Sequence, residues 1–425
     1  MRSAPFSQVA WPALRVPGGR VPPDQVAVSA SGTRVTFADG HTRLCGTSGL
    51  WNVNLGYGHP VVADAVADAA RHASYLTNFR YTHELLELAS AELLSRLSPR
   101  FSRVLWLCSG ASAVEAAVKL SRQAHALTGD VRRRIVVSFA GSYHGLSMGA
   151  SAITGEDALQ PLYGVGDGEC RKVSVDDPSE LRALLERQAG RMACVVVEPV
   201  LGSGTRPLSA GMIAALAEAQ AAGVVVVADE VATGFGRAGP FVAHQAWPFV
   251  PDVVLLSKGL TNGAVPGAAV CVGQHLVQRF VDASAVLLHA ETAGGHPLTV
   301  AAARATLSVF DDPSILAHAD RLGMQLSSRL DEVVARAPVA ARHCGAGLFR
   351  TLLWEYPDGS APDARVITNA IAHARRLGVV LHPGPGGIQF VPPLVLSEGE
   401  LDELVAAAEQ AMALALESVA EAAPL

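Results

Sequence analysis

Short apolar runs alternate with longer alanine-rich segments through the middle of the chain. The runs lie at 104–107, 135–137, 194–197, 224–227, 253–256 and 268–272. Segments with the composition of helices lie between them, at 111–125, 178–188 and 211–221. Continuous apolar strands that alternate with helices are typical of a mainly parallel sheet covered on both faces. The pattern therefore predicts an α/β fold with a mainly parallel, mixed sheet between helices.

The two ends of the chain show a different pattern. Two short strands are expected at 25–29 and 33–37, and an amphipathic helical stretch runs from about 301 to 334. Strands at 348–353, 379–381 and 388–391 and a closing helix at 397–419 follow. A chain of 425 residues exceeds what one core usually supports. We therefore expect a large domain at 48–303, a smaller α+β domain at 304–425, and an N-terminal segment, 1–47, that packs on the small domain.

Polar residues follow the carboxyl ends of five of the predicted strands. They are Ser109 and Gly110, the Ser142-Tyr143-His144 run, Glu198, Asp229 and Lys258. In parallel sheets the carboxyl ends of the strands meet at one edge, and functional sites gather there. We expect these residues to form one site.

Lys258 and Asp229 carry the most specific chemical signal. The chain has only three lysines, and Lys258 directly follows a buried strand and a single serine. Burial disfavours the charged form of an amine, and a neutral lysine can form a Schiff base. Asp229 follows four valines and an alanine, and a buried carboxylate there needs a cationic partner. A protonated pyridine nitrogen meets that need, which indicates pyridoxal phosphate (PLP) chemistry.

The motifs resemble those of the class III (ω-type) aminotransferases of PLP fold type I. The resemblance covers about residues 46–405 and is strongest in DEVATGFGR at 229–237 followed by SKGL at 257–260. Supporting matches are NLGYGHP at 54–60, SGASAVE at 109–115, YHG at 143–145, EPV at 198–200 and TAGGHP at 292–297. The resemblance implies a fold type I enzyme that uses PLP, with pyridoxamine phosphate as its second form.

The resemblance also implies roles for single residues. Lys258, Asp229 and Tyr143 are the expected catalytic residues: the Schiff-base lysine, the partner of the ring nitrogen, and an aromatic ring stacked on the cofactor, with Val231 on the opposite ring face. The full set of expected cofactor-binding residues is Lys258, Asp229, Val231, Tyr143, Ser109, Gly110, Ala111, Thr292 and Glu198. In the family, a threonine at the position of Thr292 reaches the phosphate of the neighbouring subunit. We therefore expect a homodimer with its sites at the interface.

Three positions depart from the family pattern and bear on the substrate. Ala232 and Leu201 stand where glutamine is common, and Gln389 stands where many members carry an arginine that binds an α-carboxylate. An arginine–carboxylate contact is stronger than a contact to a neutral amide. We expect weak selection for an α-carboxylate, unless Arg80 or Arg237 takes over this contact.

The expected substrate pocket is partly aromatic. Its candidate residues are Trp51, Phe79, Arg80, Tyr81 and Gln389; ordinary core packing of the aromatic rings is an equally weighted interpretation. His59 and His144 have no second ligand at fixed spacing, so we expect no metal site. A net charge of −6 without a basic stripe gives no indication of nucleic-acid binding.

The sequence also bears on location. No apolar stretch reaches the length of a membrane span, and the first residues show no signal-peptide core. The six cysteines form no Cys-x-x-Cys pair and are typical of reduced, buried thiols. We therefore expect a cytoplasmic protein with no membrane partner.

The predicted function is transamination between an amine donor and an aldehyde or ketone, in specialised metabolism. The expected small-molecule substrate lacks an α-carboxylate next to the reacting carbon, and a modified peptide terminus belongs to this class. A decarboxylase, racemase or aminomutase of the same fold is an alternative, because it would share the cofactor residues. A non-catalytic scaffold is a second alternative, which the joint presence of Lys258, Asp229 and Tyr143 disfavours.

Overall fold

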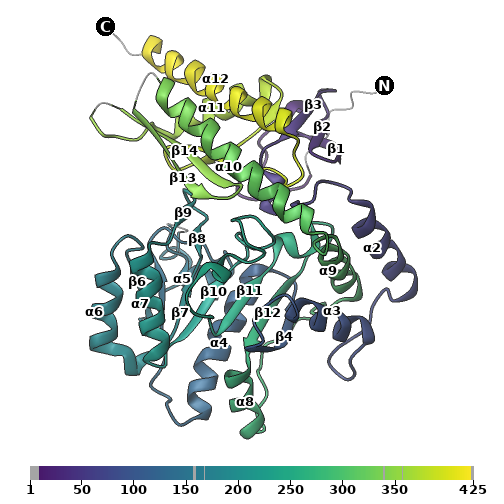
Figure 1. The fold of residues 1–425 in the computed structure, drawn as a ribbon, viewed down its shortest axis with the longest axis vertical. Coiled ribbons are helices and arrows are strands. Elements are labelled where there is room, and N and C mark those ends of the chain that lie inside the picture. Colours follow the sequence, from purple (N-terminus) through teal and green to yellow (C-terminus); the bar gives the residue numbers. More distant parts are fainter. Residues whose placement is uncertain (1–8, 157–158, 167, 338–339, 357, 423–425) are drawn as a thin grey trace.

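A seven-stranded sheet forms the centre of the protein, which is represented by a computed structural model (Figure 1). The structure describes residues 9–156, 159–166, 168–337, 340–356 and 358–422. The order across the sheet is β4 (Phe101–Leu107), β12 (Ala268–Gly273), β11 (Val253–Leu256), β10 (Val225–Asp229), β7 (Met192–Val197), β5 (Ile135–Phe139) and β6 (Cys170–Val173). Only β12 runs against its neighbours. This confirms the predicted mixed, mainly parallel sheet.

Helices cover both faces of this sheet because alternate residues of each apolar strand point to opposite sides. One face packs on α4 (Gly110–Leu127), α5 (Met148–Ile153) and α8 (Gln274–Asp282). The other face packs on α3 (Glu84–Leu94), α6 (Pro178–Gln188), α7 (Ala210–Ala221) and α9 (Pro297–Val309). Helix α2 (Pro60–His72) lies against α9 at the outside (Figure 1).

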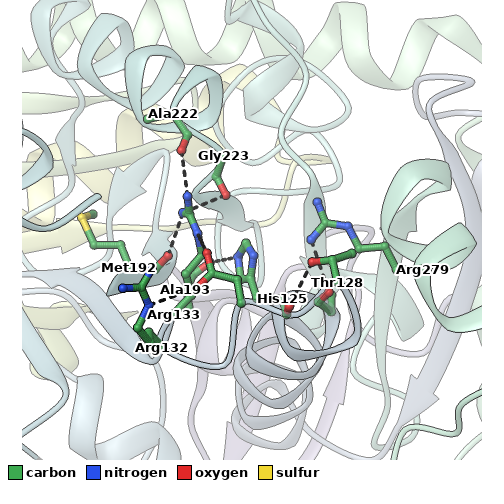
Figure 2. A network of polar contacts seen from close by, with 11 residues as sticks. His125, Thr128, Arg132, Arg133, Met192, Ala193, Ala222, Gly223 and Arg279 are labelled. Carbon is green, nitrogen blue, oxygen red and sulfur yellow. Dashed lines mark hydrogen bonds and ion pairs between the residues drawn. The ribbon is translucent and has the colours of Figure 1, made fainter. Parts of the chain in front are cut away.

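A polar network fixes the carboxyl-terminal end of α4 to the sheet (Figure 2). The buried His125 contacts the carbonyl oxygen of Ala193 in β7 through Nε2, at 3.0 Å. Arg133 donates to the carbonyl oxygens of Ala222 and Gly223, just beyond α7, where helix carbonyls lack intrahelical partners. Because the carboxyl-terminal end of α4 is held in this way, the position of its amino-terminal end is fixed as well. That end lies beside the carboxyl end of β4.

Both termini contribute to a second, smaller layer of sheets. One sheet has the order β1 (Ala27–Ser31), β2 (Arg34–Phe37), β3 (Thr42–Cys45) and β15 (Val379–Val380). The other contains β13 (Ala340–Ala346), β14 (Phe349–Glu355), β17 (Gly387–Phe390) and β16 (His382–Gly384). Helices α10 (Pro313–Arg336), α11 (Ala364–Arg376) and α12 (Glu398–Ala422) pack around them (Figure 1). Strand β3 pairs in parallel with β15, so the N-terminal strands lie beside the C-terminal part of the chain.

Several elements of the structure lie outside the predicted ones. Helices α2 and α3 and strands β6, β13 and β16 were not predicted, and neither were α1 (Ser48–Trp51) and the pair β8 (Val200–Leu201) and β9 (Arg206–Pro207). β13 reads AARHCGA, which has no apolar alternation and becomes a strand by pairing with β14. The predicted boundary at 303/304 falls inside α9, and the division into domains stays a prediction.

None of the helices in the described part of the chain is long and apolar enough to span a bilayer. Residues 1–8 of the predicted N-terminal segment and residues 423–425 at the other end lie outside the described residues.

Candidate active site

Residues from all five strand ends line one cavity. The cavity has a volume of about 200 Å³ and lies beyond the carboxyl ends of the central strands. Its lining consists of Gly110, Ala111, Tyr143, His144, Gly145, Leu146, Glu198, Asp229, Val231, Ala232, Ser257 and Lys258. The chemistry of the site follows from a few of these side chains.

Lys258 enters the cavity directly after β11. It begins the short 3-10 helix η4 (Lys258–Thr261), and its φ of 43° is unusual for a residue with a side chain. Such strained positions cluster at functional sites. Its Nζ lies 4.6 Å from the centre of the Trp51 ring. Burial lowers the pKa of this amine, although the nearby carboxylates Glu198 and Asp229 act in the opposite direction.

Asp229 is buried and pairs directly with His144. The distance from Asp229 Oδ2 to His144 Nδ1 is 2.7 Å, and Asp229 Oδ1 accepts a hydrogen bond from the Val231 amide at 3.2 Å. Burial alone would lower the pKa of His144, but the hydrogen bond and charge of Asp229 outweigh it, so that pKa is raised. His144 therefore holds one carboxylate oxygen in place and stabilises its charge.

The sequence predicts His144 at the edge of the site and gives no support for a metal ligand there, but it does not reveal this pairing. The YHG run at 143–145 was visible in the sequence, but nothing in it connects residue 144 to residue 229. The contact exists because β5 and β10 are separated by β7 alone in the sheet. Among the described side chains, none reaches the buried Nε2 of His144.

Glu198 is the second buried carboxylate of the cavity. Its Oε2 accepts a hydrogen bond from the Tyr143 amide and its Oε1 accepts one from the Gly202 amide, each at 3.0 Å. Burial raises the pKa of Glu198 to about 7, with the charge of Asp229 adding to the increase and His144 opposing it. This carboxyl group can therefore hold or release a proton near neutral pH.

Replacing Glu198 with glutamine should flatten the dependence of stability on pH. The pKa of Glu198 is about 7 in the folded protein against an ordinary value of 4.5, so between these values the folded state binds more protons than the unfolded chain. The stability contributed by this group is full below about pH 4.5 and is lost as the pH rises to about 7, a change on the order of 3 kcal/mol. The melting temperature of Glu198→Gln relative to wild type should therefore rise between pH 5 and pH 7.

Glu218→Gln is the control for this experiment. Glu218 is a surface carboxylate whose pKa is lowered by its hydrogen bond to Arg182, so it is already ionised at pH 5. Its removal should leave the shape of the melting curve against pH unchanged. Parallel curves for wild type and Glu198→Gln would show that Glu198 does not titrate in this range.

The amino terminus of α4 forms the end of the cavity suited to an anion. Ser109 caps the helix by accepting a hydrogen bond from the Ser112 amide at 3.2 Å. Gly110 and Ala111 line the cavity at the first turn, where backbone N–H groups and the helix dipole favour negative charge. The side of the cavity is kept open by Gly145, because a Cβ there would lie 2.6 Å from the Cβ of Ala111.

Tyr143, Trp51 and Gln389 occupy different positions around the site. Tyr143 lines the cavity and is 39% exposed, so one part of its ring faces solvent. Trp51 packs edge-on against Phe349, with its ring facing Lys258. Gln389 is buried in β17, and its Nε2 donates to the carbonyl oxygen of Gly202 at 2.8 Å. Its amide is thus engaged with the protein itself.

Four other predicted site residues do not line this cavity. Phe79, Arg80, Tyr81 and Thr292 are all exposed. Tyr75 connects the two segments, because its hydroxyl donates to the carbonyl oxygen of Thr292 at 2.9 Å. Within one subunit the structure does not bring these four residues to Lys258.

Arg237, the other candidate for a carboxylate contact, has a structural position. It is fully buried and donates to Ser48 Oγ and Asn54 Oδ1, both at 2.9 Å, and to the carbonyl oxygens of Leu348 and Pro392. Burial lowers its pKa to about 9. These contacts join the segment after β10 to the small-domain strands and leave the guanidinium group away from the cavity lining.

A comparison with known proteins identifies the family. The model of the aminotransferase class-III family matches residues 18–412. The chain belongs to this family. It is therefore a PLP-dependent aminotransferase of fold type I, and the enzymes of this family act on small-molecule amines and carbonyl compounds.

Curated relatives and solved structures agree with this assignment. The chain is 34% identical over 408 residues to an acetylornithine aminotransferase of Mycobacterium tuberculosis, which covers 93% of the chain and 94% of the relative. It is 32% identical to the acetylornithine aminotransferase of Mycolicibacterium smegmatis over 94% of the chain and 96% of the relative. The crystal structure of an amine transaminase from an uncultivated Pseudomonas species, in its PLP-bound form, matches with a TM-score of 0.89 and 28% identity over 97% of this chain and all of that one.

The residues of the cavity fit PLP. The cavity offers a lysine for covalent attachment, a buried carboxylate that can face a ring nitrogen, and a helix amino terminus for a phosphate. Val231, expected on the ring face opposite Tyr143, lies close to α4, and a Cβ at Gly110 would lie only 3.1 Å from its Cγ1. Glycine at position 110 therefore keeps the cavity wall at Val231 undistorted.

Proposed function

We propose that this aminotransferase transfers an amino group between an amine whose reacting carbon bears no α-carboxylate and an aldehyde or ketone. The observation that carries the proposal is the lining of the cavity. Among the described residues, no arginine lines the cavity around Lys258, and the amide at Gln389 is bound to Gly202. Arg237 is bound to other protein groups as well. A fixed cationic clamp for an α-carboxylate is therefore missing from the described part of this subunit.

The walls of the site support an uncharged or aromatic substrate. Trp51 presents its ring beside Lys258, and Leu146 and Ala232 add apolar surface. Apolar walls bind the hydrocarbon part of an amine by removing it from water. Enzymes with this selectivity suit specialised metabolism, including the modification of a peptide terminus, and we place the protein there.

The proposed roles of the catalytic residues follow from their positions. When bound, PLP supplies a ring that withdraws electrons from the carbon next to the nitrogen. Lys258 would hold the cofactor through Nζ and would move the proton at the reacting carbon; its lowered pKa favours the neutral amine that this needs. Asp229, held by His144, stabilises a proton on the ring nitrogen.

Further residues position the reacting groups. Tyr143 and Val231 confine the ring from the cavity walls, and Ser109, Gly110 and Ala111 bind the phosphate at the start of α4. Glu198 fixes the Tyr143 backbone through its hydrogen bond and can exchange a proton near neutral pH. All of these residues lie at the carboxyl ends of the central strands.

We further propose that the protein is a homodimer that shares its sites. Several large apolar side chains are exposed: Leu146 (47%), which lines the cavity, and also Met148 (62%), Leu288 (79%), Phe79 (60%) and Tyr81 (56%). Exposed apolar side chains of this size support an interaction surface. In such a dimer Thr292 of one subunit would bind the phosphate of the other, and the segment 79–81 would complete the partner's substrate pocket. A cytoplasmic location stays a prediction.

The test is a titration of the PLP-loaded protein with candidate donors, in which the absorbance of the cofactor is the readout. The donors are 1-phenylethylamine, L-alanine, L-glutamate and N-acetyl-L-ornithine. We expect 1-phenylethylamine to bleach the yellow form at concentrations at least about tenfold lower than L-alanine or L-glutamate, since these two carry a carboxylate on the reacting carbon and need a clamp for it. Preferential bleaching by L-alanine or L-glutamate would overturn the proposed selectivity, whereas N-acetylornithine, the substrate named for the curated relatives, presents a terminal amine whose carbon bears no carboxylate.

A yellow protein that none of the donors converts, but that releases carbon dioxide from an amino acid or racemises it, would contradict transamination. The same-fold decarboxylase or racemase would then be the correct function. Reappearance of the yellow form when benzaldehyde is added to the bleached enzyme would establish the second half of the reaction.

A further inference from the structure

The segment 286–292 lies along α4 and ends at Thr292, and the proposed function gives a role to that last residue alone. Three polar side chains of α4 hold the segment at successive points. The contacts are Gln123 to the carbonyl oxygen of Val286, Lys119 to that of Leu288, and Ser112 to His289. The segment therefore runs toward the amino terminus of α4, where Ser109, Gly110 and Ala111 are proposed to bind the phosphate.

Glu291 is the residue of this segment that reaches the phosphate-binding turn. Its Oε2 accepts a hydrogen bond from the Cys108 amide at 2.5 Å, and Cys108 directly precedes the helix cap Ser109. The Cys108 thiol also contacts the Glu291 carboxylate and the Ala293 amide, and burial together with Glu291 raises the pKa of this thiol to about 11. The thiol is therefore neutral at physiological pH and carries no charge that would repel Glu291 or a phosphate.

The backbone that follows Glu291 is packed closely against β4. A Cβ at Gly294 would lie 2.8 Å from the carbonyl oxygen of Trp106, so the approach requires glycine. The Gly294 amide donates to the carbonyl oxygen of Glu291 at 3.0 Å and closes a turn that contains Thr292. The hydroxyl of Tyr75 donates to the carbonyl oxygen of Thr292. The backbone around Thr292 is thus fixed, while residue 292 itself remains exposed.

Two neighbouring residues of one chain therefore serve two different phosphate sites. Glu291 supports the turn that binds the phosphate of its own subunit, and in the proposed dimer Thr292 binds the phosphate of the other subunit. Adjacent Cα atoms lie only about 3.8 Å apart, so a displacement of Glu291 also displaces Thr292. Hydrogen bonds to a phosphate tolerate little displacement, because they weaken outside donor–acceptor distances of about 2.7–3.2 Å.

We infer that Glu291 is a positioning residue that links the two phosphate sites of the dimer, through the Cys108 amide at its own site and through Thr292 at the other. This inference rests on the dimer of the proposed function, and it names a residue outside the set that touches the cofactor. Loss of the carboxylate should weaken PLP binding at both sites. The residues that contact PLP would all remain in place.

The first test measures the affinity for PLP by equilibrium dialysis, so that no turnover is needed. Glu291→Ala should bind PLP about tenfold more weakly than wild type. Glu291→Gln keeps a carbonyl oxygen for the Cys108 amide and should stay within about twofold of wild type. This rescue separates loss of the contact from a general loss of folding. Equal weakening in both variants would overturn the role of the Cys108 contact.

Glu180→Ala is the matched control. Glu180 Oε2 accepts a hydrogen bond from the Ser174 amide at 2.7 Å, which is a contact of the same kind beside α6. Because Glu180 does not line the cavity, its removal should leave the affinity for PLP unchanged.

Two heterodimers, assembled from differently tagged subunits, separate the two halves of the link. A Lys258→Ala subunit cannot form the yellow lysine-bound cofactor, so the yellow absorbance reports only the site of the other subunit. In the first heterodimer a Glu291→Ala subunit pairs with a Lys258→Ala subunit, and the reporting site lacks Glu291 on its own turn. In the second, a wild-type subunit pairs with a subunit that carries both substitutions, and the reporting site receives Thr292 from a chain without Glu291.

The affinity for PLP at the reporting site should fall about threefold in each heterodimer, because the two losses together give the about tenfold loss of the Glu291→Ala homodimer. Wild type paired with Lys258→Ala supplies the reference affinity. Unchanged affinity in either heterodimer would overturn the link and leave the aminotransferase function intact, since the donor titration tests that function separately. A wild type that sediments as a monomer with full affinity for PLP would instead contradict the proposed dimer, and the link with it.

Discussion

Lys258→Ala should lose transamination by a factor of at least about 10⁴, because it removes both the covalent attachment point and the group that moves the proton. The amine is buried beside two carboxylates, and its lowered pKa favours the neutral form required for both tasks. The measurement is the rate of a single half-reaction with the best donor, followed by absorbance. The variant should also show bound cofactor with the spectrum of a free aldehyde.

Lys172→Ala is the matched control, because Lys172 is an exposed lysine on the edge strand β6. It should keep wild-type activity and the wild-type spectrum. Because burial of a polar amine opposes folding, cofactor-free Lys258→Ala should melt at the same temperature as cofactor-free wild type or higher. A Lys258→Ala protein that retains more than about a hundredth of the activity would assign proton transfer to another group.

Thr292→Glu should abolish activity although residue 292 does not line the cavity of its own subunit. In the proposed dimer a carboxylate at this position faces the phosphate of the partner's cofactor, and like charges repel across an interface. We expect the affinity for PLP to fall by at least about 100-fold, measured by equilibrium dialysis and by absorbance. Because Thr292 is exposed, the variant should fold normally.

Mixing two inactive variants identifies the subunit that supplies Thr292. A heterodimer of Lys258→Ala with Thr292→Glu contains one site with an intact Lys258 and an intact Thr292 only if the threonine comes from the partner. After random exchange of subunits, about a quarter of wild-type activity should return. Thr368→Glu, an exposed threonine on α11, is the control and should be active alone. No recovery in the mixture, or a Thr292→Glu protein that is fully active by itself, would contradict the shared site.

The sequence by itself determined the sheet and the chemical centre of the protein. Apolar runs without interruption must be buried on both faces, and parallel strands place their carboxyl ends together, so Lys258, Asp229 and Glu198 could be assigned to one rim in advance. The predicted run 253–256 coincides with β11, and 178–188 coincides with α6. Where a signal is local and periodic, the sequence was sufficient.

Only the tertiary structure decided which side chains meet. The His144–Asp229 pair, the contact of Gln389 with Gly202, and the edge contact of His382 with Trp51 join residues 85, 187 and 331 positions apart in the chain. No local pattern encodes such contacts, because they depend on strand order and on how the smaller sheets sit on the large one. The sequence therefore determined which reactive residues are available. The packing of distant strands decided which groups hold those residues in place and which substrates the site can select.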